Sequence, residues 1–282
     1  MEKKLTIADL FTAKDEDRKL VAVSCYDYTT AALAAQAEVD IILVGDSAAQ
    51  IMLGFDSTLP VSMDTMVTLT SAARRGAPNQ FLVADMPFLS YQASLAEAMK
   101  NAGRFVTESG AQMVKIEISH AYLDVIKMVS NAGIAVMAHI GIRPQFIGQM
   151  GRFKAEGTTA EMAYELLLFA DQLIEAGARA LLIEGTAAEV AERITQRVKV
   201  PVIGCGSGPG CDGQVLIAAD ILGLTQGCKP KFSRSFVELG EQCVAGFADY
   251  ASNVRDRQYP GKQHSYHMKK GELGRLSSLL GE

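Results

Sequence analysis

Short, continuous apolar runs recur along this chain and alternate with longer amphipathic segments. The runs are rich in Val, Ile, Leu and Ala and show no apolar–polar alternation, which is typical of strands covered on both faces. Strands that alternate with helical segments in this way predict a parallel sheet. The predicted strands are residues 19–25, 40–46, 81–85, 113–117, 134–140, 179–184, 200–204 and 220–224.

The segments between these runs carry helix-start signals. Residues 94–109 begin with Ser94 and Glu97, which have the spacing of a capping box, and residues 158–177 begin with Thr158 in the same arrangement. Eight strand–helix units without a dinucleotide-binding fingerprint favour a closed (β/α)₈ barrel over an open sheet. The length of 282 residues is usual for one such barrel.

We expect one barrel domain over residues 1–260, with amphipathic helices over 230–255, followed by a polar C-terminal tail over 261–282. Two connections, 47–61 and 142–158, are longer than the loops that usually join a strand to a helix. Both contain apolar residues and glycines, so we expect ordered lids rather than disordered segments.

Composition narrows the class of function. The formal net charge is −5 and the sequence has no basic stripe, which argues against a nucleic-acid partner. No apolar run approaches the roughly 18 residues that a membrane span needs, and the first residues lack the apolar core of a secretory signal. The five cysteines form no CxxC motif, so neither a disulfide framework nor a zinc site is indicated. We therefore expect a cytoplasmic enzyme.

Four of the predicted strands end in an acidic residue: Asp46, Asp85, Glu117 and Glu184. The C-terminal ends of barrel strands gather around one mouth, where the active sites of this fold lie. Like charges held together there need a cation. Ligands that are all oxygen favour a hard divalent cation, and a small number of protein ligands with open positions on the ion favours Mg²⁺.

Two basic side chains accompany these acids. Lys115 stands two residues before Glu117, so both side chains point to the same face of their strand. His139 closes the fifth run. Each residue alone has a structural alternative, because strand-end acids often cap helices, a lysine can serve in a structural ion pair, and a histidine can be buried and hydrogen-bonded. The whole set together indicates a functional site.

Long motifs, spread in order over residues 20–250, resemble the ketopantoate hydroxymethyltransferase family. More distantly, the chain is similar to the phosphoenolpyruvate mutase and isocitrate lyase barrels. The motifs that carry the family resemblance are CYDYTTA (25–31), VGDSAAQIMLGFDSTLPVSMDTM (44–66), ADMPFLSY (84–91), VKIE (114–117), AHIGIRPQ (138–145) and CDGQVLIAADILGL (211–224).

The resemblance implies a (β/α)₈ barrel enzyme that assembles as a homodecamer. The implied reaction transfers a hydroxymethyl group from 5,10-methylenetetrahydrofolate to 3-methyl-2-oxobutanoate, giving 2-dehydropantoate in pantothenate and coenzyme A biosynthesis. It proceeds through an enolate stabilised by one Mg²⁺ per subunit. Carried over by motif, Asp46 and Asp85 would bind the metal and help to hold the oxo acid. Glu117 would complete the metal shell, directly or through water.

Other roles follow from the same motifs. Ser47 would contact the carboxylate of the substrate, and Lys115 would neutralise charge on a substrate oxygen. His139 is a further candidate for substrate contact. Glu184 occupies the position of the catalytic base in the family, so we expect it to remove the proton from C3 of the oxo acid.

Several residues near these motifs depart from the family pattern. Ala48 and Ala49 stand in place of Leu-Gly, Ile118 and Ser119 in place of Gly-Gly, and Cys205 in place of an isoleucine. These departures motivate a second hypothesis, a divergent Mg-dependent aldolase or lyase that acts on a different 2-oxo acid. A third hypothesis is a non-catalytic binding paralogue, against which the retained acids and lysine argue.

Overall fold

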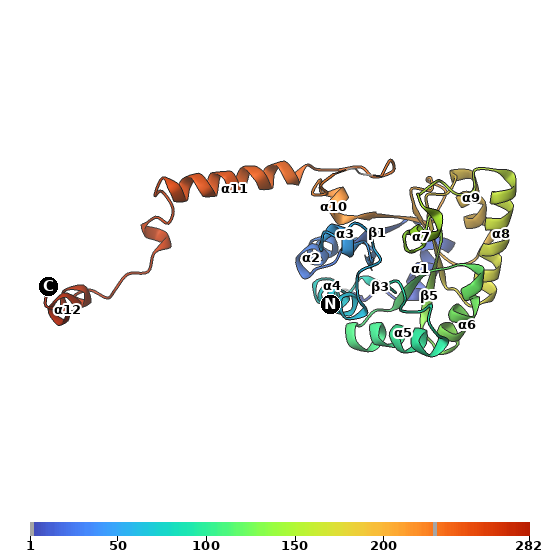
Figure 1. The fold of residues 1–282 in the computed structure, drawn as a ribbon, viewed down its shortest axis with the longest axis horizontal. Helices are drawn as coiled ribbons and strands as arrows, with labels where there is room; N and C mark the ends of the chain where they lie inside the picture. The colour runs from blue at the N-terminus through green and yellow to red at the C-terminus, as the bar shows by residue number, and fades with distance from the viewer. Residues whose placement is uncertain (1–2, 228–229) are drawn as a thin grey trace.

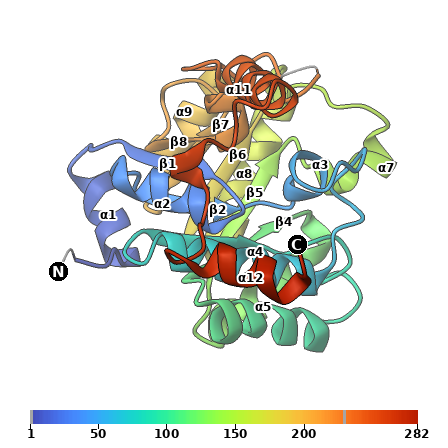
Figure 2. The ribbon, with the colours of Figure 1, turned by 90° about the vertical axis from the view of Figure 1, so that its left-hand side faces the viewer.

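The computed structural model describes residues 3–227 and 230–282. Across these residues, eight parallel strands pair in chain order and β8 closes onto β1 (Figure 2). The predicted closed (β/α)₈ barrel is therefore confirmed. The strands are β1 (Leu20–Ser24), β2 (Ile41–Val44), β3 (Phe81–Asp85), β4 (Met113–Glu117), β5 (Ala135–Gly141), β6 (Ala180–Glu184), β7 (Val202–Cys205) and β8 (Gly213–Ile217).

The first seven strands lie within one or two residues of their predicted bounds, but the prediction for the eighth is wrong. Residues 220–224 fall in α10 (Ala218–Ile221) and the turn after it. The true β8 pairs with β1 along its whole length, from Leu20 beside Gly213 to Ser24 beside Ile217. The error arose because residues 206–212, all described, form glycine-rich turns instead of the helix expected between two strands.

Helices surround the barrel on the outside (Figure 1). α5 (Leu95–Ser109) is capped by Ser94 as predicted, but α8 (Ala160–Glu175) is capped by Thr159 and not by Thr158. The other helices are α1 (Ile7–Asp15), α2 (Tyr28–Gln36), α3 (Ala48–Ile51), α4 (Met63–Gly76), α6 (Leu123–Asn131), α7 (Ile147–Met150), α9 (Ala188–Arg197), α11 (Leu239–Arg255) and α12 (Glu272–Leu280), with 3₁₀ turns η1 (His120–Tyr122), η2 (Pro144–Phe146) and η3 (Lys262–His264).

The barrel interior is filled with apolar side chains and changes character toward the mouth. Phe81, Val83 and Met113 belong to the buried interior cluster, together with residues of α1. Because side chains alternate along a strand, the residues two and four positions after an inward-pointing residue also point inward. Continuing from Met113, this alternation carries Lys115 and Glu117 into the barrel, as predicted. An apolar core thus passes directly into a polar mouth.

The C-terminal segment leaves the barrel instead of covering it (Figure 1). All residues of α11 are described, and none of them is buried. α12 overlies the barrel in Figure 2 only in projection, because Figure 1 shows it far to one side. The outer surface of β1 is left partly uncovered, and Val21 there is 51% exposed.

The structure bears on membrane-spanning segments and on the cysteines. Within residues 3–227 and 230–282, no helix has both the length and the apolar content to span a membrane. The described cysteines Cys25, Cys205, Cys211 and Cys243 are free thiols, and Cys228 lies outside the described residues.

Candidate active site

Three acids and one lysine meet at the mouth of the barrel. Asp46, Asp85 and Glu117 are 3%, 1% and 1% exposed, and Lys115 is 4% exposed. The backbone N–H of Asp46 donates to Asp85 Oδ2 at 3.1 Å, and Lys115 Nζ lies 2.9 Å from the same oxygen. The ends of β2, β3 and β4 thus bring four of the sequence-predicted residues together.

The charges in this cluster do not balance. Three carboxylates and one ammonium leave two negative charges in a buried space, where charge is poorly solvated. Burial and the neighbouring Asp85 raise the pKa of Asp46 to about 7. Burial and the charge of Asp46 also raise the pKa of Glu117 well above its usual range. Burial alone would lower the pKa of Lys115, but the surrounding carboxylates outweigh it and raise that pKa. The cluster therefore binds protons readily unless another cation compensates it.

His139 links the lysine to Glu184. Lys115 Nζ lies 3.1 Å from His139 Nδ1, and His139 Nε2 lies 3.4 Å from Glu184 Oε2. Burial and the charge of Lys115 keep the pKa of His139 well below its usual range, so the ring is neutral. An ammonium can only donate, so Nδ1 accepts and the ring proton sits on Nε2, facing Glu184. Burial raises the pKa of Glu184 itself to about 7.

Ser47 and Glu184 stand on opposite sides of the mouth, because β2 and β6 are four strands apart in an eight-stranded barrel. Both side chains are partly exposed, whereas the acids between them are buried. Ser47 Oγ lies 2.7 Å from the hydroxyl of Tyr26, a residue that the sequence alone did not single out. Ser47 and Glu184 are therefore the residues of this set that solvent reaches most readily.

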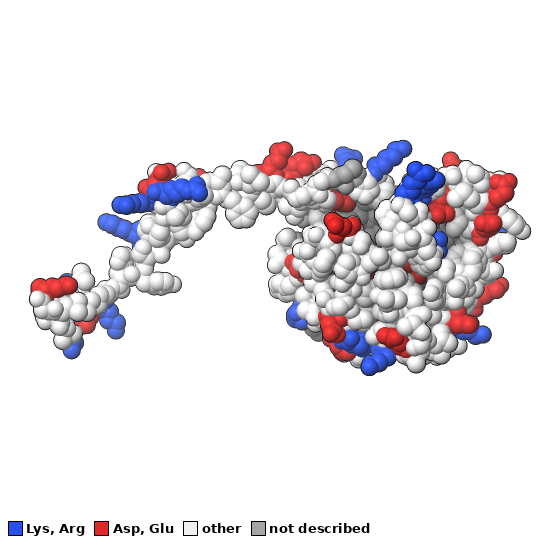
Figure 3. All heavy atoms as spheres, in the orientation of Figure 1, with Lys and Arg blue, Asp and Glu red and all other residues white. Residues whose placement is uncertain are grey.

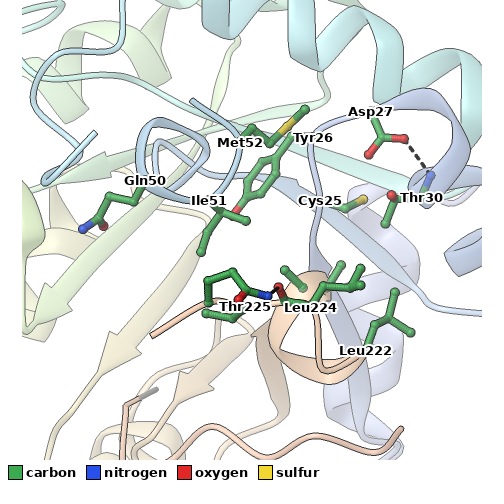
Figure 4. Close-up of a pocket in the computed structure, with 13 residues that line it drawn as sticks. Cys25, Tyr26, Asp27, Thr30, Gln50, Ile51, Met52, Leu222, Leu224 and Thr225 are labelled. Atoms are coloured by element: carbon green, nitrogen blue, oxygen red, sulfur yellow. Dashed lines mark hydrogen bonds between the residues drawn. The ribbon is translucent and has the colours of Figure 1, made fainter. Parts of the chain in front are cut away.

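A cavity of about 310 Å³ lies beside this site rather than over the acids (Figure 4). Its walls come from the turn after β1, from α3 and from the segment that follows β8. Tyr26 is its link to the site, because its ring lines the cavity while its hydroxyl meets Ser47. The cavity adjoins the Ser47 side of the mouth and not the Glu184 side.

Gln145 contacts two of the acids and was also missed from the sequence. Its Nε2 donates to Asp46 Oδ2 at 2.8 Å, and its backbone N–H donates to Glu117 Oε2 at 2.8 Å. Gln145 follows Pro144 at the start of η2, where helical N–H groups have no partner inside the helix. A glutamine in that position, just beyond the strand that carries His139, was the available signal.

The longer of the two predicted lids is ordered and tied to the strand that bears Glu184. Glu156 forms a parallel bridge with Thr186. The Glu156 N–H donates to the carbonyl of Gly185 at 3.0 Å, and Ala187 N–H donates back to the carbonyl of Glu156 at 3.0 Å. The other predicted lid contains α3, directly after Ser47.

A parallel (β/α)₈ barrel with buried strand-end carboxylates at its C-terminal mouth defines a class of enzymes that carry out their chemistry at that mouth. Within this class, the chain belongs to the ketopantoate hydroxymethyltransferase family, whose model matches residues 4–262.

Curated relatives agree over nearly the whole chain. The 3-methyl-2-oxobutanoate hydroxymethyltransferase of Geobacillus kaustophilus is 44% identical over 264 residues, covering 94% of this chain and 95% of the relative. The enzyme of the same name from Geobacillus thermodenitrificans is 43% identical over 267 residues, covering 95% of this chain and 96% of the relative.

Solved structures support the fold. Phosphonopyruvate hydrolase in complex with oxalate and Mg²⁺ has a TM-score of 0.60 at 14% identity, covering 98% of this chain and 95% of that chain. 2,3-Dimethylmalate lyase, a PEP mutase/isocitrate lyase superfamily member, has a TM-score of 0.59 at 18% identity, covering 98% of this chain and 96% of that chain. The predicted type of barrel is thereby confirmed.

Proposed function

We propose that this protein transfers a hydroxymethyl group from 5,10-methylenetetrahydrofolate to 3-methyl-2-oxobutanoate, giving 2-dehydropantoate for pantothenate biosynthesis. The observation that carries the proposal is the meeting of Asp46, Asp85, Glu117 and Lys115 at the mouth of a barrel that belongs to this family. The names of the relatives support the same substrate.

The residues present fit a bound Mg²⁺. Asp85 Oδ1 and Glu117 Oε1 are buried acceptor atoms without a hydrogen-bond partner among the described residues. Two residual negative charges match one divalent cation. In the described part of the chain, no three His, Cys, Asp or Glu side chains are close enough to hold an ion by themselves. By their place in the family motifs, Asp46 and Asp85 would ligate the ion, Glu117 would complete its shell directly or through water, and open positions would remain for substrate oxygens.

The chemistry begins with the loss of a proton from C3 of the oxo acid. When bound, Mg²⁺ would act as a Lewis acid toward the carboxylate and keto oxygens of the substrate. The hydroxyl of Ser47, oriented by Tyr26, would hold the substrate carboxylate, and Lys115 would offset charge developing on the keto oxygen. Glu184 would take the C3 proton, and His139 Nε2 lies 3.4 Å from its Oε2.

One water would add to the one-carbon unit of the folate, both of its C–N bonds would break, and the two protons of the water would end on the two folate nitrogens, releasing tetrahydrofolate and formaldehyde. The carbon nucleophile would then attack the formaldehyde carbon. The oxygen of the water becomes the oxygen of the new CH₂OH group, which takes up the C3 proton. Glu184 is the residue placed to pass the C3 proton onward.

The direct test is formation of 2-dehydropantoate from the two substrates with and without EDTA. We expect product that depends on tetrahydrofolate chemistry and is lost on chelation. Absence of product from this substrate pair, with metal occupancy verified, would reject the proposal.

A divergent aldolase or lyase acting on another 2-oxo acid is favoured by one feature of the mouth. Cys205 pairs in register with Glu184 and packs toward the barrel interior, where the family has the larger isoleucine. The shorter side chain leaves more room beside the base. Metal-dependent deuterium exchange at C3, measured across a panel of 2-oxo acids, separates the two functions. Fastest exchange with 3-methyl-2-oxobutanoate would eliminate the alternative.

A homo-oligomer is supported by the C-terminal arm, which we define as α11 and α12. The apolar residues Val244, Phe247, Tyr250 and Val254 recur at helical spacing along α11 and are all exposed. On the face of α11 that Figure 3 shows, charged side chains gather near the two ends of the helix and none is seen between them. Such a stripe needs a covering surface.

The barrel supplies a matching surface. Val21 on the outer face of β1 and Leu33 on α2 are apolar and are 51% and 56% exposed. Reciprocal exchange of arms between copies would cover both surfaces at once. We propose the decamer of the family as the assembled form, and the free thiols support a cytoplasmic location.

A further inference from the structure

We propose that Gln145 is a positioning residue that sets metal affinity by fixing the direction of the two carboxylates it binds, Asp46 and Glu117. The inference rests on the metal site of the proposed function and extends it to a residue with no assigned role. Gln145 is 3% exposed and belongs to the loop after β5, yet it contacts the ends of β2, β3 and β4.

Both polar atoms of the Gln145 side-chain amide have hydrogen-bond partners. Its Nε2 donates to Asp46 Oδ2 at 2.8 Å and to the carbonyl of Met86 at 3.0 Å. Its Oε1 lies 2.7 Å from the hydroxyl of Tyr91, whose single proton it shares with the backbone carbonyl of Glu117, 2.8 Å from the same hydroxyl. A backbone carbonyl can only accept, so the atom facing Met86 must be the nitrogen and the amide cannot be flipped. Asp46 therefore receives a donor and never an acceptor.

This arrangement divides the oxygens of each acid into two kinds. Gln145 occupies Oδ2 of Asp46 and Oε2 of Glu117, and Lys115 occupies Oδ2 of Asp85. The opposite oxygens of Glu117 and Asp85 have no partner among the described residues. In Asp85 and Glu117, one oxygen is held by the protein and the other is left for a cation. Ligands oriented in advance bind a metal more tightly than ligands that must be ordered first.

A purely structural role would look different. Asn101 is also a buried carboxamide, at 8% exposure, and its Nδ2 donates to the carbonyl of Ser90 at 2.7 Å. That bond joins α5 to a loop and contacts none of the acids. Asn101 is therefore the control for losing a buried amide that binds none of the acids, in the stricter position next to Tyr91, since its partner Ser90 directly precedes that residue.

The experiment measures Mn²⁺ binding to the full chain by the loss of the free-ion EPR signal, with no substrate present. The variants are Gln145→Met, which keeps length and volume but removes the amide, Tyr91→Phe, and the control Asn101→Leu. Thermal unfolding of each variant reports its fold. We expect the Mn²⁺ dissociation constant to rise roughly 10–100-fold in Gln145→Met. We expect a smaller rise, about three- to tenfold, in Tyr91→Phe, and less than a twofold change in Asn101→Leu.

Wild-type protein and Asp85→Ala are measured in parallel. If the wild type binds no Mn²⁺, or Asp85→Ala binds it equally well, the metal site of the proposed function is wrong and this inference falls with it. If those two behave as expected but Gln145→Met binds Mn²⁺ within twofold of wild type, only the role of Gln145 is overturned. Should Gln145→Met fail to fold, Tyr91→Phe decides: binding within twofold of wild type overturns the inference.

Discussion

The barrel mouth and the C-terminal arm are built on opposite principles. At the mouth, most polar groups are bound by other residues of the same chain, but three carboxyl groups face a single ammonium, Lys115. Along α11, no charged group is buried, but apolar side chains are exposed, and Phe247 is 74% exposed. The mouth has an excess of acidic groups, which a small cation would balance. The arm has exposed apolar side chains, which a protein surface would bury.

The largest effect is expected from removing one acid of the mouth, Asp85. Asp85→Ala removes a proposed ligand and leaves the buried ammonium of Lys115 without its nearest acid, at 2.9 Å. We expect metal binding and turnover to be lost together, measured by Mn²⁺ titration and product formation. Retention of either one would separate Asp85 from the metal site. The arm should be unaffected, so sedimentation velocity of the variant should match wild type.

The second largest effect concerns the base. Glu184→Gln should keep the metal but slow deuterium exchange at C3 roughly 10²–10⁴-fold, the usual worth of a positioned base. The base must be deprotonated to act, and burial raises the pKa of Glu184 to about 7. Exchange by wild type should therefore rise with pH up to about 7 and then level. Exchange by the variant at the wild-type rate would remove Glu184 from this role.

The arm can be tested without touching the mouth. Val244→Asp combined with Phe247→Asp places two charges in the apolar stripe of α11, so association between copies should weaken at least tenfold in analytical ultracentrifugation. Gln242→Asp, on the opposite side of the helix, is the control and should associate normally. Circular dichroism should show an intact barrel in both. Unchanged association of the double variant would show that α11 is not an interface.

The smallest expected effect is on stability. The pKa of Glu184 is higher in the folded chain, about 7, than its ordinary value of 4.5. The folded state therefore holds this proton more tightly, and the stabilisation is present below about pH 4.5 and lost as pH rises through 7. In EDTA, the unfolding free energy of the wild type should fall by about 1–2 kcal/mol between pH 5 and 8, relative to that of Glu184→Gln. This loss is smaller than the full pKa shift would give, because the Glu184 side chain is 21% exposed and its charge is partly screened.

Urea unfolding at both pH values measures this difference, with Glu165→Gln on the surface of α8 as the matched control. A wild-type stability that does not fall relative to Glu184→Gln would contradict the raised pKa. The arm variants should show the same pH dependence as wild type, because no residue of the mouth lies on α11.

Individual strands and helix caps show which parts of the fold could be predicted from the sequence. The strand that ends in Glu117 was predicted to the residue, because a continuous apolar run has few alternatives. The strand Gly213–Ile217 was missed, because it follows turns rather than a helix and its glycine weakens the local signal. Thr159 replaced Thr158 as a cap for a related reason, since adjacent threonines are equivalent until the chain path selects one.

The sequence by itself determined the barrel and the ring of acids at its mouth. Parallel strands buried on both faces must be written as apolar runs, and the residue that ends each run must emerge at the same end of the sheet. Only the tertiary structure decided that Gln145 reaches two of those acids, that Lys115 places the proton of His139 toward Glu184, and that α11 departs from the barrel. Those outcomes depend on which strand ends become neighbours and where a loop returns, and local spacing along a chain does not encode either.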